Sequence, residues 1–424
     1  MEIVEATFQI VTPMFIGGAD QEPSDGVRPP SVKGALRFWW RALNWGRFRA
    51  ECSCDELALM LLHDEEARLF GGSAKHEGQG CFLLTVRHSQ LSETVKGNVH
   101  QSFKPTKQKT RNGQQEIDEN DMAAARYLGY GLMAAFTSKD RETKEIKFRA
   151  GQLDRGCLNE DQSFTVVLIF RNSIDESILR ALKVFGLLGG LGSRSRHGMG
   201  SVTLETIICN QKEKIWEAQT TQEGYQTEVK ALIGALAGVP KPEYSAFSDG
   251  SRVDCLLSDR SPYVVLDQLG VRVLDYRSWG QSSRDNILPS SKKSEKRFED
   301  DHKWFREADT FRPANLDFHP KRVAFGLPHN YDSKNKKHMV NAVNYERRAS
   351  PLFFHVHRLS DKEYIGISVL LKSRFLPDGE KINAGGKHVD QNINWAVITD
   401  FLDGKAGNPP TSTNRFPRKK AVLP

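Results

Sequence analysis

The first half of the chain alternates between short, strand-like and longer, helix-like patterns of apolar residues. Residues 2–12 have the period of two that is typical of a half-buried strand, and Pro13 ends it. Residues 32–45 have the period of an amphipathic helix, for which Ser31 is the expected N-cap. The same reasoning predicts helices over 55–70, 122–136 and 174–188 and strands over 81–86, 164–170 and 201–208.

These elements follow a known order. Without the helices over 55–70 and 122–136 and a long projecting loop over 89–120, residues 1–210 run strand, helix, strand, strand, helix, strand. That order is the one of the ferredoxin-like fold, which RNA-recognition modules share. A polar stretch over 210–227 marks a boundary, so we predict a first domain over 1–210 and a second over 211–424.

The second half is less regular. It has helical patterns over 228–237, 263–276 and 395–402, a short strand pattern over 253–257, and a predicted hairpin of 352–356 with 364–371. Residues 282–301 are charged and lack periodicity, and the tail after Gly404 is expected to be loose. We therefore predict an α+β fold of two tandem ferredoxin-like domains, the second degenerate, with helical and loop insertions.

Composition narrows the possible partners. The 424 residues include 60 Lys and Arg against 53 Asp and Glu, a net charge of +7. The bases gather in clusters, which favours an anionic polymer such as RNA. No apolar run approaches the ~20 residues of a membrane span, the first residues lack a signal-peptide layout, and six irregularly spaced cysteines do not describe a disulfide framework. We expect a cytoplasmic protein without a membrane partner.

The first basic cluster lies on the predicted helix over 32–45. Lys33, Arg37 and Arg41 are four residues apart, so they share one face and repel each other without an acidic partner on the helix. That arrangement suits phosphate binding. Trp40 lies at the edge of this face, where either base stacking or core packing explains it. Arg28 belongs to the same cluster, and Arg347 and Arg348 form another in the second half.

The second candidate is a glycine-rich loop over 189–201 (GGLGSRSRHGMGS), between a predicted helix and a predicted strand. A turn alone needs one or two glycines, whereas this loop has five, together with hydroxyl groups and two guanidinium groups that suit phosphate. Its spacing matches neither a P-loop nor a dinucleotide fingerprint, and it follows a helix rather than a strand. We therefore predict contact with phosphate and no nucleotide cofactor.

The sequence gives only weak signals for an enzyme or a metalloprotein. Cys52 and Cys54, with His63 and Cys81 further on, supply only half of a zinc pattern. An RNA-cleaving role would need His197 as a general acid or base, or Asp20 and Asp25 to hold a metal ion. A histidine in a glycine loop is more often a hydrogen-bond donor, and loop aspartates are more often turn residues. We predict no metal and no catalytic residue.

Several segments resemble the RAMP superfamily of CRISPR systems, and within it the first RAMP subunits of type III-B Cmr effector complexes. They are residues 12–20 (TPMFIGGAD), 28–41 (RPPSVKGALRFWWR), 69–71 (LFG), 127–132 (YLGYGL), 325–328 (FGLP) and 347–352 (RRASPL), together with the glycine-rich loop. The double tryptophan in a basic helix is the most distinctive. Residues 89–120 and 282–310 do not take part in the resemblance.

The resemblance implies two packed ferredoxin-like domains without catalytic activity. It also implies a position at the end of a helical ribonucleoprotein, with other Cmr subunits as neighbours, that holds the 3′ region of the CRISPR RNA and its target RNA. Lys33, Arg37 and Arg41 would hold phosphates from one side of a cleft and residues 193–197 from the other. The expected RNA-binding set is Arg28, Lys33, Arg37, Trp40, Arg41, Gly192, Ser193, Arg194, Ser195, Arg196, His197, Arg347 and Arg348.

Two alternatives remain open. A RAMP endoribonuclease would process repeat or target RNA through His197 or the loop with Asp20 and Asp25. A structural adaptor would touch only protein, and its glycine-rich loop would make no contact with RNA.

Overall fold

The computed structural model describes residues 1–72, 78–140, 142–278, 295, 297–298, 300–301, 318–332, 337–406, 411–412 and 415–423. The first domain has a five-stranded antiparallel sheet in the order β11-β10-β1-β9-β2. Its elements are β1 (Glu2–Ile10), α1 (Pro29–Glu51), α2 (Asp55–Phe70), β2 (Phe82–Arg87), β9 (Gln162–Phe170), α4 (Glu176–Leu188), β10 (Val202–Cys209) and β11 (Glu213–Glu217).

The predicted alternation in the first strand is confirmed. Every second residue of β1 from Val4 to Ile10 is buried beneath the helices, and Phe8 stacks on Phe164 of β9 with ring centroids 5.4 Å apart. The sheet extends past residue 210, because β11 pairs with β10. Helix α1 begins at Pro29, whose fixed φ suits a first turn, so Arg28 and not the predicted Ser31 is the N-cap.

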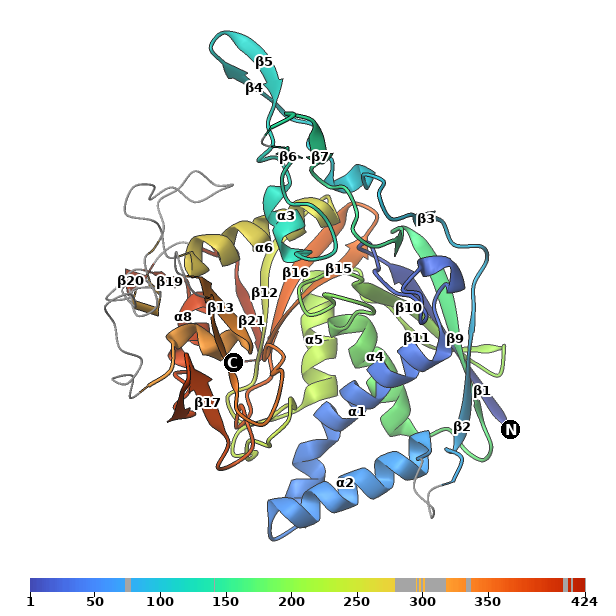
Figure 1. The fold of residues 1–424 in the computed structure, drawn as a ribbon. Helices are drawn as coiled ribbons and strands as arrows, with labels where there is room; N and C mark the ends of the chain where they lie inside the picture. The colour runs from blue at the N-terminus through green and yellow to red at the C-terminus, as the bar shows by residue number, and fades with distance from the viewer. Residues whose placement is uncertain are drawn as a thin grey trace.

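The second domain repeats the same order of elements. They are β12 (Arg252–Asp259), α6 (Pro262–Arg277), β15 (Leu352–Ser360), β16 (Glu363–Leu370), α8 (Ala396–Leu402) and β21 (Lys420–Leu423). The sheet order β15-β16-β12-β21 matches the first domain without β11, so the prediction of tandem ferredoxin-like domains is confirmed (Figure 1). Helix α5 (Gln222–Ile233) connects the two domains in the chain.

The prediction of a loose tail after Gly404 is wrong at its end. Strand β21 pairs with β12, with Val253 opposite Leu423, and supplies the last strand of the second sheet. A strand of four residues is too short to give a periodic signal. The charged stretch over 282–301 lies almost entirely outside the described residues.

Further strands of the second half form a separate sheet in the order β13-β14-β17-β18, beside the short helix η5 (Lys321–Phe325). These strands are β13 (His329–Asp332), β14 (Lys337–Ala342), β17 (Lys381–Ala384) and β18 (Lys387–Asp390). A small pair, β19 (Lys405–Ala406) and β20 (Thr411–Ser412), completes the described strands of the second half.

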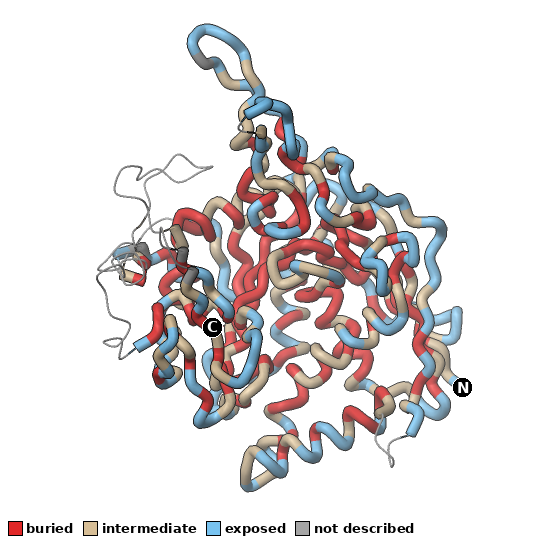
Figure 2. The backbone as a smooth tube through the Cα atoms, in the orientation of Figure 1, coloured by how far each residue is buried: buried red, intermediate tan, exposed pale blue. Residues whose placement is uncertain are grey.

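An insertion between β2 and β9 projects from the body of the molecule, and its tip is exposed (Figures 1 and 2). It contains β3 (Glu93–Thr94), η2 (Gln101–Phe103), β4 (Gln108–Arg111), β5 (Gln114–Ile117), α3 (Ala123–Leu128), β6 (Ser138–Lys139), β7 (Ile146–Phe148) and β8 (Cys157–Leu158). The predicted loop over 89–120 thus contains the hairpin β4–β5. The helix predicted over 122–136 ends at Leu128, because Gly129 caps it and Gly131 takes a φ of +82°.

Candidate nucleic-acid interface

The glycine-rich loop connects α4 to β10 and packs between the two domains. Gly192 has a φ of +84°, and a Cβ there would lie 2.4 Å from the carbonyl oxygen of Phe15. Gly198 has a φ of +85°, and a Cβ there would lie 2.7 Å from Leu266 of the second domain. Close packing therefore accounts for these glycines, and their number is not in itself evidence for phosphate binding.

The inner half of the loop, residues 196–198, joins the domains. Arg196 donates from Nη1 to the carbonyl oxygen of Ser350 at 2.5 Å, and its guanidinium lies 4.3 Å from the ring centre of Phe353 and 5.5 Å from that of Phe38. Its own carbonyl accepts the N–H of Phe354 on β15. Burial lowers the pKa of Arg196 to about 10, so it remains a cation at neutral pH.

His197 faces the domain contact, which corrects its assignment to the RNA-binding set. Nδ1 lies 3.1 Å from the carbonyl oxygen of Leu128, which can only accept, so Nδ1 carries the proton. Burial, reinforced by Arg194, lowers the pKa of His197 to about 4 and leaves it neutral. With Leu128 and Phe354 it lines a cavity of about 30 Å³, which is too small for a nucleotide.

The outer half of the loop, residues 192–195, faces outward. Arg194 is exposed and donates from Nε to the carbonyl oxygen of Tyr130 at 2.9 Å. Ser193 accepts from Nη1 of Arg155 at 2.9 Å. Within the described part of the chain, neither arginine pairs with a carboxylate. Arg155 lies on the connection between β7 and β9, where no sequence pattern distinguishes it.

The backbone of this half is also available to a ligand. Arg194 has a left-handed φ of +60°. Its N–H, that of Ser195 and that of Arg196, where the inner half begins, donate no hydrogen bond to any described residue. Successive free N–H groups in a turn form a concave anion site. This outer half therefore keeps the phosphate-binding chemistry that the sequence predicted for the whole loop.

Helix α1 turns a different face to the loop than the predicted one. Ser31, Ala35 and Phe38, spaced four and three residues apart, line a hollow of about 360 Å³ with Gly192 and Ser195. Lys33 and Arg37 lie on another side of the helix and do not line it. The prediction that the basic stripe forms the wall opposite the loop is therefore wrong for these two residues.

The basic stripe also has the acidic partner that the sequence did not reveal. Glu66 of α2 is 2% exposed and accepts from Arg37 Nε at 2.5 Å and Arg41 Nη1 at 3.1 Å. Lys33 has no such partner in the described part of the chain. Partial burial lowers its pKa, reinforced by the nearby charge of Arg37. An interhelical pair of this kind cannot be read from the spacing within one helix.

Trp40 is a core residue. Its side chain is fully buried, and Nε1 donates to Ser177 Oγ of α4 at 2.8 Å. Base stacking is therefore excluded for Trp40, and the core-packing alternative is correct. The accessible aromatic ring near the loop is instead that of Phe38, two residues before Trp40, which is half-buried and lines the hollow.

A second hollow of about 640 Å³ adjoins the first, because Phe38 and Arg196 line both. Arg41, Glu66 and Arg348 contribute charged groups to it. We call the two hollows together the inter-domain groove. The sequence-predicted residues that line it are therefore Gly192, Ser195, Arg196, Arg41 and Arg348.

The remaining predicted residues lie outside this lining. Arg347 is exposed. Its neighbour Arg348, which does line the groove, is held in place because its Nη2 donates to Ser373 Oγ at 2.7 Å. Arg28 lies at the start of α1, with Nε 3.9 Å from a carboxylate oxygen of Asp25.

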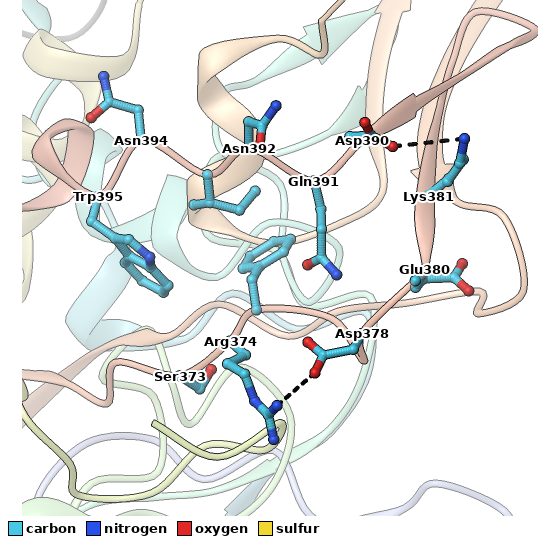
Figure 3. A pocket seen from close by; sticks show the side chains of 13 residues that line it. Ser373, Arg374, Asp378, Glu380, Lys381, Asp390, Gln391, Asn392, Asn394 and Trp395 are labelled. Atoms are coloured by element: carbon cyan, nitrogen blue, oxygen red, sulfur yellow. Dashed lines mark hydrogen bonds and ion pairs between the residues drawn. The ribbon is translucent and has the colours of Figure 1, made fainter. Parts of the chain in front are cut away.

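Another hollow, of about 790 Å³, lies in the second domain (Figure 3). Asp378, Glu380 and Asp390 outnumber its cations Arg374 and Lys381. Asp378 accepts from Arg374 at 2.7 Å, and Lys381 lies 3.7 Å from Asp390. This lining is net negative and internally paired, so it does not suit a phosphate backbone.

The described residues contain no group of three or more His, Cys, Asp and Glu side chains arranged to hold a metal ion, and all six cysteines are free thiols. Among the helices of this part of the chain, none has the length and apolarity to cross a membrane.

Two antiparallel sheets of matching topology, joined by a glycine-rich loop, define the class as a tandem ferredoxin-like protein. The family model of the RAMP superfamily matches residues 7–203, which run from the middle of β1 to the start of β10. Over this range, slightly less than half of its length, the chain is similar to members of the RAMP superfamily.

Known proteins extend this result. The chain is 28% identical over 212 residues to CRISPR system Cmr subunit Cmr1-2 of Pyrococcus furiosus, an alignment that covers 48% of this chain and 96% of the relative. The crystal structure of apo Cmr1 from Pyrococcus furiosus superposes with a TM-score of 0.51 at 17% identity, covering 100% of this chain and 99% of that one. A subunit in the cryo-EM structure of the type III-B Cmr-beta bound to cognate target RNA has a TM-score of 0.49 at 13% identity, covering 95% and 98%.

Proposed function

We propose that this chain is a non-catalytic RNA-binding subunit of a type III-B CRISPR interference complex. It caps the end of the backbone near the 3′ region of the CRISPR RNA and clamps guide and target RNA, with other Cmr subunits as its neighbours. The curated Cmr1-2 relative and the superposition on Cmr1 support the assignment to a Cmr complex.

The observation that carries the proposal is the outer half of the loop. Arg194 and Arg155 are cations without a carboxylate partner among the described residues, and three successive N–H groups beside them are free. Such groups bind phosphate without reading base edges. A complex that takes its specificity from base pairing with a guide needs contacts of this kind.

The geometry favours this function over the endoribonuclease. His197 is neutral, donates from Nδ1 to the carbonyl oxygen of Leu128 and lines a cavity of about 30 Å³ that has no room for a nucleotide, which does not suit a general acid or base acting on a phosphate. Asp20 accepts the N–H of Glu22 at 3.0 Å, as a turn residue does, and Asp25 lies beside Arg28. No described cluster supplies the further ligands that a catalytic metal would need.

The test compares RNA binding by the wild type and the Arg194→Ala/Arg155→Ala variant over a range of salt concentrations. We expect the variant to bind a guide–target duplex about 10-fold more weakly at low salt and to have a shallower salt dependence, because it releases fewer counterions. Fluorescence anisotropy measures both quantities.

The control is Lys212→Ala/Lys214→Ala, which also removes two positive charges, but just beyond the far end of β10, about 25 Å from the loop at 3.3 Å per residue. It should leave affinity and slope nearly unchanged. Equal effects of both variants would show that only net charge matters, and unchanged binding by the arginine variant would disprove the proposed interface.

A further inference from the structure

Two tyrosines at the root of the projecting insertion are exposed although their surroundings are buried. The side chains of Tyr127 and Tyr130 are 44% and 68% exposed, whereas every other residue from 123 to 129 is buried. The N–H of Tyr130 donates to the carbonyl oxygen of Tyr127 at 3.0 Å, so a tight turn holds the two residues together. Both belong to the segment YLGYGL, to which neither the fold nor the inter-domain groove assigns a role.

The support beneath these tyrosines is rigid. The fully buried Arg126 donates to four backbone carbonyl groups at 2.6 to 2.8 Å. Asp267 of α6 accepts the N–H groups of Ala124 and Ala125 at 3.1 and 3.0 Å. Figure 1 shows α3 lying along α6. A ring on such a support loses little conformational entropy when a flat ligand covers it.

The tyrosines adjoin the phosphate-binding half of the glycine-rich loop. The carbonyl oxygen of Tyr130 accepts Nε of Arg194, and the rest of this guanidinium has no partner among the described residues. The nearest heavy atom to a Cβ built on Gly131 is Nη2 of Arg194, at 3.7 Å. The backbone that carries the exposed ring of Tyr130 therefore adjoins a free cation. Arg194 is held there by a left-handed backbone that a non-glycine residue rarely adopts.

We propose that Tyr127 and Tyr130 stack on unpaired nucleobases of an RNA strand whose phosphates bind at Arg194. The inference rests on the proposed function and extends it, because it adds single-stranded RNA, next to the clamped duplex, as a ligand of this surface. Stacking requires a base that is not already stacked in a helix, and an aromatic ring accepts any base.

The charge around the rings favours RNA over a protein partner. The protein groups bonded to Arg194 and to the adjoining Ser193 and Arg155 are backbone carbonyls and a hydroxyl, without a carboxylate. An apolar protein surface would bury this cation unpaired, which is costly, whereas a nucleotide supplies its counterion in the same residue.

The experiment measures binding of the full chain to a fluorescent oligouridine of about 12 nucleotides and to the same ribose-phosphate chain without bases. We expect Tyr127→Ala/Tyr130→Ala to lose about 10-fold in affinity for oligouridine and less than 2-fold for the abasic strand. The Tyr127→Phe/Tyr130→Phe variant keeps the rings and should bind like the wild type. Phe148→Ala, which removes another exposed aromatic of the same insertion, should have no effect.

Equal losses on both strands, or none on oligouridine, would overturn the inference. So would a loss in Phe148→Ala of the same size, or tyrosine variants that bind RNA normally but no longer retain a partner subunit. Arg194→Ala separates this inference from the proposed function, because it should weaken both strands alike. If Arg194→Ala binds both strands more weakly while the tyrosine variants bind like the wild type, only the stacking inference fails. If the wild type binds neither the single strands nor the duplex, the stacking inference and the proposed function both fail.

Discussion

Arg194 and Arg196 stand two residues apart in one loop and have opposite surroundings. Arg196 lies over the adjacent rings of Phe38 and Phe353 and bonds to the second domain, whereas Arg194 extends outward beside Tyr130. The two halves of the loop thus have different roles, although the sequence predicts phosphate binding for both. The inner half joins the domains, and the outer half is open to a ligand.

The difference teaches how to interpret a glycine-rich, basic loop. Composition alone suggests a phosphate site throughout the loop. However, the guanidinium of Arg196 already contacts two aromatic rings and donates to Ser350, and the glycines beside Leu266 and Phe15 are required for close packing. A basic residue remains available to bind phosphate when some of its N–H groups have no hydrogen-bond acceptor within the protein. Variants of the inner half should therefore change stability, and variants of the outer half should change binding.

The largest expected effect is on the inner half and comes from acid. His197 packs at the domain contact, and His355 and His357 are fully buried on β15. Burial lowers the pKa of His197 to about 4 and that of His355 to about 3, and it also lowers the pKa of His357. In the unfolded chain these histidines have a pKa near 6.5. Below that pH the unfolded chain binds more protons than the folded chain, so the stability present above pH 6.5 is lost as the pH falls.

We expect the free energy of unfolding to drop by about 1.4 kcal/mol per pH unit for each of these histidines between pH 6.5 and 5. Urea unfolding at several pH values measures the slope. His355→Leu should make it shallower, while the exposed His388→Leu should not. A slope that His355→Leu leaves unchanged would contradict the assignment.

The second prediction concerns the backbone of the loop. In Gly192→Ala the new methyl group meets the carbonyl oxygen of Phe15 at a left-handed φ, so we expect a loss of about 3 kcal/mol in unfolding free energy. Gly234→Ala is the matched control, since Gly234 has a φ of +76° but open space around it, and should cost about 1 kcal/mol. Equal losses in chemical denaturation would show that strain, not packing, governs this position.

The fold was largely predictable because its strands and helices have clear periods. The buried alternation of β1 and the pairing of β15 with β16 follow directly from apolar spacing. Strand β21 was missed because four residues carry no period, and its position depends on the partner β12. The helix predicted over 122–136 was too long because Gly129 and Gly131 end it after Leu128.

The site was predictable only in part, because contacts between distant segments decide which of its side chains remain free to bind a ligand. Glu66, 25 residues beyond Arg41, pairs with two of the three cations of a stripe that looks unpaired on its own helix. Burial of Trp40 depends on Ser177 of another helix. Arg155 and Tyr130 reach the loop from the insertion, and for Tyr130 the segment YLGYGL was a signal without an assigned role.

The smallest expected effect sharpens the comparison between the loop and the basic stripe. Glu66→Gln keeps the shape of the side chain but removes the charge that pairs with Arg37 and Arg41, so both cations become available to RNA. We expect affinity for a guide–target duplex to rise about threefold at low salt, with a steeper salt dependence. The matched control is Glu65→Gln, since Glu65 pairs with Arg68 and not with Arg37 or Arg41. Fluorescence anisotropy at two salt concentrations distinguishes the variants, and an equal rise in both would mean that the stripe acts only through net charge.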